Sequence, residues 1–189
     1  MTTALITPAA LEPLTIAEIK THLRIDHDHE DTLLAQTLEA ARAYVEFASG
    51  TKLITQLWRQ YENCFPSDRR VKLRIQPFQS VDTVTVFDHE GTPTILAPAD
   101  YAVRRDGDAV IIEFAASLAD DLAVNGLEVD CVFGFGDLGI DVPPALRRAI
   151  LLLVAHWYEF RGAISPQDQP VSLPPGFDAL MAPFNRVRL

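Results

Sequence analysis

The feature that most constrains the fold is a change of hydrophobic period along the chain. Between residues 53 and 140 apolar residues alternate with polar ones, as at Val71, Leu73 and Ile75, which is typical of half-buried strands. On either side, apolar residues recur every three or four positions, which is typical of helices. The pattern therefore predicts an α+β fold, in which an antiparallel β module is inserted into a helical frame.

Two helices are predicted before the β module. Thr15 and Glu18 have the spacing of a capping box, so a short helix is expected to begin there and to end near Arg24. A second helix is expected from about Glu30 to Ser49, with Gly50 as its stop. Few residues join the two helices, which predicts that they pack as an antiparallel hairpin.

The β module is expected to hold about six strands between Ile54 and Phe133. Asp106-Gly107 lies between two alternating runs and is a strong hairpin signal. Most neighbouring runs are separated by too few residues for a crossover helix, so antiparallel pairing is predicted.

A third helix is predicted to open at Pro143-Pro144 and to stop at Gly162. The proline-rich segment from Ala163 to Pro175 indicates an extended linker, and Pro183 limits any helix in the tail to a turn or two. The predicted organisation is a helix hairpin (1–52), an inserted β module (53–140), a long helix completing the helical core (141–162), and a linker with an extended C-terminal tail (163–189).

Charge excludes some functions. The net charge is −10, although residues 143–189 carry 5 Lys/Arg against 3 Asp/Glu. Tight binding to nucleic acid needs clustered Lys/Arg, so the acidic body argues against it, while DNA can still pass nearby without binding. Neither a signal peptide nor an apolar run long enough for a bilayer is recognised, so a soluble protein made in a cytoplasm is expected.

Few side chains in the sequence are candidates for a catalytic role. Cys64 and Cys131 lie in apolar, strand-like contexts and are expected to be reduced core residues. His156 has no partner nucleophile in the sequence, so a core or interface histidine is expected.

Two motifs invite a ligand but fail in detail. The acidic run Asp26–Asp31 departs from a calcium loop, because Asp31 and Thr37 stand where glycine and glutamate are required. Glycines at 134, 136 and 139 have G-x-G-x-x-G spacing, but prolines follow and no second βαβ unit does. No catalytic, cofactor-binding or metal-binding residue is therefore predicted, and no cofactor.

Several stretches spread over nearly the whole chain resemble one known family, with the β middle contributing least. They are Leu5–Pro8, Leu11–Thr15, Ala17–Asp26, Ala40–Glu46, Leu53–Gln56, Val142–Glu159 and Gly176–Phe184. Together they look like the head-tail connector (adaptor) proteins of tailed phages, prophages and gene transfer agents.

The resemblance implies a structural protein and not an enzyme. Its implied form is a ring, commonly dodecameric, beneath the portal protein, where it extends the DNA channel and joins capsid to tail. The implied partners are other copies of the chain, the portal protein, and a stopper or other tail-side neck protein. The implied location is the neck of a virion or phage-like particle assembled in a bacterial cytoplasm, with no membrane contact.

The apolar, arginine-bearing tail is the candidate portal-binding segment. Its predicted contact residues are Phe177, Leu180, Met181, Phe184, Arg186 and Arg188. The open alternative is that this tail packs on its own subunit.

Other functions remain as alternatives. The chain is also compatible with another neck or tail-completion protein. From a different class, a small enzyme with a scattered site or a ligand-binding module would be favoured by a deep pocket with converging polar groups.

Overall fold

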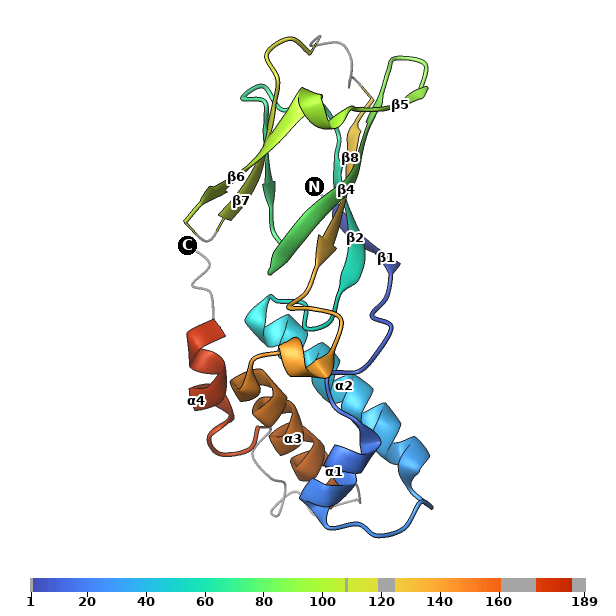
Figure 1. Cartoon of the computed structure of the whole chain (residues 1–189), viewed down its shortest axis with the longest axis vertical. Helices are drawn as coiled ribbons and strands as arrows, with labels where there is room; N and C mark the ends of the chain where they lie inside the picture. Colours follow the sequence, from blue (N-terminus) through green and yellow to red (C-terminus); the bar gives the residue numbers. More distant parts are fainter. Residues whose placement is uncertain (1, 108, 119–124, 161–172, 185–189) are drawn as a thin grey trace. The chain divides into compact units, whose positions relative to one another are not determined.

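The chain separates into two compact units, each with its own core. The computed structural model describes residues 2–107, 109–118, 125–160 and 173–184. The β unit comprises Met1–Pro8 and Thr55–Gly134, and the helical unit comprises Ala9–Ile54 and Phe135–Leu189 (Figure 1). Helices and antiparallel sheets occur together, so the predicted α+β class is confirmed.

The β unit contains two antiparallel sheets. One has the strand order β1-β2-β8-β4-β5 and the other β3-β7-β6. The strands are β1 (Thr2–Thr7), β2 (Gln56–Glu62), β3 (Arg70–Leu73), β4 (Phe78–Phe87), β5 (Pro93–Ile95), β6 (Tyr101–Asp106), β7 (Ala109–Phe114) and β8 (Leu127–Phe133). The predicted hairpin at Asp106-Gly107 joins β6 to β7, and Gly107 has the positive φ of 58° that such a turn requires.

Both sheets contribute side chains to one core. In β8 the alternate residues Leu127, Val129, Cys131 and Phe133 point inward, and β7 supplies Ile112 and its neighbours from the other sheet. The alternation predicted from the sequence therefore places one face of each sheet against the other.

The first strand lies within the predicted helix hairpin (1–52) but belongs to the β unit. Thr2–Thr7 forms an edge strand antiparallel to β2, with Ala4 opposite Arg59. Every residue of β1 except Ala4 is exposed, so the run has no apolar alternation to mark it as a strand. Its partner is also distant in sequence, and such pairing leaves no local signal.

The helical unit contains α1 (Ile16–Leu23), α2 (Asp31–Ser49), α3 (Pro144–Glu159) and the short α4 (Phe177–Met181). The predicted capping box is present: the Thr15 hydroxyl accepts from the Glu18 N–H at 3.2 Å, and Glu18 accepts from the Thr15 N–H at 2.8 Å. Gly50 ends α2 with a φ of 66°. Gly162, the predicted stop of the third helix, lies outside the described residues.

The helices pack differently from the predicted hairpin. α2 packs most extensively against α3, while α1 contacts both and α4 packs on α3. The buried face of α2 carries Leu34, Leu38, Ala41 and Val45, and the wide apolar face of α3 meets it. Because α3 presents more apolar surface than the short α1, it is the main partner of α2.

Candidate interaction surface

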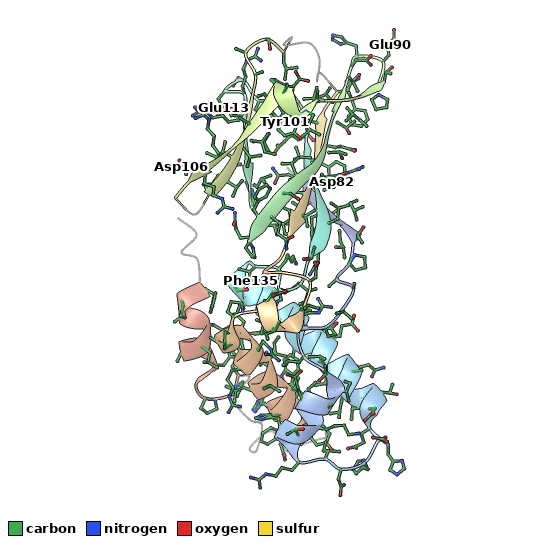
Figure 2. The ribbon with its side chains drawn as sticks, viewed as in Figure 1. Asp82, Glu90, Tyr101, Asp106, Glu113 and Phe135 are labelled. Atoms are coloured by element: carbon green, nitrogen blue, oxygen red, sulfur yellow. The ribbon has the colours of Figure 1, made fainter. Side chains whose placement is uncertain are left out.

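Within the described residues, no group of three or more His, Cys, Asp or Glu side chains could hold a metal ion. Acidic side chains of the β unit such as Asp82, Glu90, Asp106 and Glu113 are spread over different strands and turns instead of converging (Figure 2). In the part of the chain that is described, no helix has the length and apolarity needed to cross a bilayer.

The glycines at 134, 136 and 139 have a packing role. A Cβ added to Gly136 would lie 2.3 Å from the Asp141 carboxylate, and one on Gly139 would lie 2.5 Å from the Pro13 carbonyl oxygen. Gly134 has a positive φ of 138°. Protein atoms therefore fill the space beside Gly136 and Gly139 where a nucleotide-binding loop would approach its phosphate.

The two cysteines have different environments. Cys131 is buried in the β core, and burial raises the pKa of its thiol to about 12. Cys64 is exposed, so its predicted core position is wrong. β2 ends at Glu62, and Cys64 therefore lies in the turn beyond, where alternation no longer places side chains inward. His156 is half-buried on α3, with its ring 5.0 Å from that of Phe160.

An apolar groove with a volume of about 770 Å³ lies on the helical unit. It is lined by residues 11–16 and Glu18, by Ala35 and Leu38 of α2, by residues 138–140, and by Arg147 of α3. Three of its large apolar side chains are unusually exposed: Leu11 at 55%, Leu138 at 54% and Ile140 at 79%. Exposed apolar residues that converge on one concavity are typical of an interaction site.

The wall that carries Leu138 and Ile140 is held in place by short-range contacts. Asp141 accepts from the Leu138 N–H at 2.9 Å and donates its own N–H to the Leu138 carbonyl at 3.0 Å. Gly139 fits directly against Pro13, as its missing Cβ shows. These contacts present the apolar side chains in a fixed arrangement, which reduces the entropy lost on binding.

Charges beside the groove are paired with one another. Arg147 donates to Glu18, and Arg42 donates to Glu12 at 2.8 Å. The backbone N–H of Thr15, followed by its hydroxyl and by Arg147, lowers the pKa of the Glu18 carboxyl despite partial burial. The groove therefore offers a partner mainly apolar surface.

The groove is not among the features predicted from the sequence. Leu11, Leu138 and Ile140 lie in segments without helical or strand periodicity. Their exposure depends on the contact between Gly139 and Pro13, which are distant in sequence. The only local signal is two large apolar residues separated by a glycine.

The predicted portal-binding tail lies partly inside the helical core. Phe177 and Met181 of α4 are buried there, and Leu180 and Phe184 pack against the same cluster. Burial of each large apolar side chain is worth roughly 1.5–3 kcal/mol, which favours α4 in this position. Arg186 and Arg188 lie outside the described residues. The role of all six residues in portal binding stays a prediction.

Comparison with known proteins identifies the class. A family model described as Phage gp6-like head-tail connector protein matches residues 13–86. No curated protein matches the chain.

Solved structures match over the full length. A chain from "Neck of empty GTA particle computed with C6 symmetry" has a TM-score of 0.83 and 26% identity, and the match covers 100% of this chain and 97% of that one. With the same coverage, "Virion of native gene transfer agent (GTA) particle" gives 0.82 and 27%, and "Neck of native GTA particle computed with C12 symmetry" gives 0.81 and 26%.

These matches define a structural component of a phage-like particle, and none of them is described as an enzyme. Within that class, the resemblance to the head-tail connector family is confirmed.

Proposed function

We propose that this protein is a head-tail connector that forms a ring in the neck of a phage or gene transfer agent particle. The observation that carries the proposal is the similarity of both units, over 100% of the chain, to a chain of a gene transfer agent neck. A match of this extent supports a shared structural role better than one shared domain would, because single folds host many functions.

The finer proposal is a dodecamer that sits beneath the portal protein and continues the DNA channel toward the tail. The C12 symmetry of one similar neck supports the subunit number. The net charge of −10 suits a channel wall, because repulsion of phosphates lets DNA slide without binding.

The test is the mass of the assembly, measured by native mass spectrometry and negative-stain imaging, for the chain alone and mixed with its candidate portal protein. A ring with a central hole, formed alone or on the portal, is the expected result. A monomer that ignores the portal would overturn the proposal. A ring that binds only a tail-side protein would indicate another neck component.

Portal binding by the C-terminal tail is tested by reversing the charge of its two predicted contact arginines. We expect Arg186→Glu/Arg188→Glu to weaken portal binding, because the two substitutions reverse the charge of the predicted contact while Phe177 and Met181 of α4 are unchanged. Arg104→Glu/Arg105→Glu on the exposed strand β6 is the matched control and should bind normally. Equal portal affinity of the tail variant and the wild type would exclude the arginines from the contact.

A further inference from the structure

One face of α2 is exposed and carries no charge. Successive residues on this face are alternately three and four positions apart, as in a helix that packs against another surface. They are Leu33, Gln36, Ala40, Ala43 and Phe47. Phe47 is 82% exposed, the highest value among the large apolar residues that the structure describes as exposed. We refer to these five residues as the α2 stripe.

The α2 stripe lies opposite the face that α2 buries. Leu38 and Phe47 are nine positions apart, which places them about 180° apart around a helix of 100° per residue. Leu38 is buried at 2% exposure and contributes to the groove described above. The helical unit therefore has a convex apolar stripe on one side of α2 and an apolar groove on another.

The charge of the chain indicates which partner could cover the stripe and the groove. Two copies of a chain with a net charge of −10 repel each other, so they approach best through uncharged patches. The stripe has no ionisable residue, and the acids Glu12 and Glu18 beside the groove are already paired with arginines. A projecting, exposed aromatic side chain and a fixed apolar concavity are also the usual partners in an interface core.

Symmetry decides how the two surfaces combine. A contact between two different patches repeats from copy to copy and closes a ring when the rotation between neighbours is a whole fraction of a turn, whereas a patch that binds itself gives a twofold dimer and stops. We propose that the α2 stripe of one copy packs into the groove of the next copy, with Phe47 near Leu11, Leu138 and Ile140. This inference rests on the proposed ring and identifies the surfaces that build it.

A cross-linking experiment between two variants tests the direction of the contact. In a Cys64→Ser background, which removes the exposed native thiol, Phe47→Cys and Ile140→Cys chains are prepared separately and mixed. A short bismaleimide is expected to join one variant to the other, and neither variant to itself. Phe47→Cys chains that cross-link to one another would overturn the proposal in favour of a twofold contact.

Substitutions test whether the contact maintains the ring. Phe47→Glu and Ile140→Glu should each weaken assembly by on the order of tenfold or more, because a charge would be buried against apolar side chains. Both residues are highly exposed in the subunit, so thermal unfolding of the monomer should be unchanged. Ile95→Glu on β5, at 69% exposure, is the matched control and should assemble normally.

The outcomes separate this inference from the proposed function. Rings that persist in both variants, together with no cross-link in the mixture, would overturn the inference while the connector role stands. A wild-type chain that never forms rings, alone or with its portal, would overturn both.

Discussion

Asp130 is a carboxylate of the β unit that several side chains bond. It accepts two hydrogen bonds from the Arg59 guanidinium, at 2.6 and 2.7 Å, and one from the Thr83 hydroxyl at 3.1 Å. These residues are cross-strand neighbours on β2, β8 and β4. Asp130, with Glu128 nearby, raises the pKa of Arg59 above its ordinary value. The cluster thus links three strands on the face of the sheet that is turned away from the core.

Removal of this carboxylate should destabilise the protein. Asp130 is 6% exposed, and Asp130→Asn removes the buried charge that accepts both Arg59 hydrogen bonds. Arg59 keeps its ion pair with Glu128 at 2.6 Å, so the free energy of unfolding should fall by about 2 kcal/mol. Urea denaturation measures the change. Glu113, which pairs with the exposed Arg70 and Arg104, is the control, and Glu113→Gln should have little effect. Equal losses in the two variants would contradict a special role for Asp130.

The two thiols should react at very different rates. The exposed Cys64 is expected to react with a thiol reagent in the native protein. Cys131 is buried with a pKa raised to about 12, so it should react only after denaturant is added. Time-resolved labelling with mass spectrometry distinguishes the two sites. Rapid native labelling of Cys131 would mean that β8 opens readily.

At the scale of elements, the start of α1 has both a helix cap and an ion pair with α3. Glu18 completes the capping box with Thr15 and also accepts from Arg147. Thr15→Ala should lower the free energy of unfolding by about 1 kcal/mol. Thermal or urea unfolding of the variant measures this loss. Thr21→Ala within the same helix, where the hydroxyl donates to the Ala17 carbonyl, is a suitable control.

The same box predicts a pH dependence. The pKa of Glu18 is lowered from its ordinary value of 4.5, so its stabilising contribution is fully present above pH 4.5 and is lost as pH falls through the lower, folded-state pKa. Glu18→Gln should therefore reduce the loss of stability between pH 5 and pH 3, as measured by unfolding midpoints at a series of pH values. An unchanged pH profile would show that the Glu18 carboxylate is not held more tightly in the fold.

Elements with local signals were predictable from sequence, and those fixed by distant contacts were not. The cap at Thr15, the stop at Gly50 and the Asp106-Gly107 hairpin depend on neighbouring residues, and each was predicted where the structure has it. The edge strand β1 depends on pairing with β2, and the groove depends on Gly139 meeting Pro13. The exposed position of Cys64 was missed because apolar context does not reveal where a strand ends.

At the scale of the whole molecule, the chain passes between its two units three times, near residues 8, 54 and 134. All buried residues of the helical core come from the helical unit, and all those of the β core come from the β unit. Each core is therefore complete without side chains from the other unit, although neither unit is one continuous stretch of sequence.

The ends of the long β insertion are neighbours. Gln56 at the start of β2 is paired with Phe133 at the end of β8, which places their Cα atoms about 5 Å apart. Just outside the insertion, the Phe135 N–H donates to the Leu53 carbonyl at 3.1 Å, and Ile54 forms a β-bridge with Gly136. A short turn can therefore join residue 54 to residue 135 without disturbing the helical core.

Because these ends are neighbours, another domain could be inserted into the helical unit in place of residues 55–134. A chain without residues 1–8, in which a Gly-Ser turn replaces 55–134, is expected to fold and to keep the helix content of α1–α4, as circular dichroism and thermal melting would measure. A non-cooperative melt would contradict the independence of the two cores. If copies of the helical unit still associate, a foreign domain with neighbouring termini could be displayed at regular intervals around a neck, with the β module as the exchangeable part.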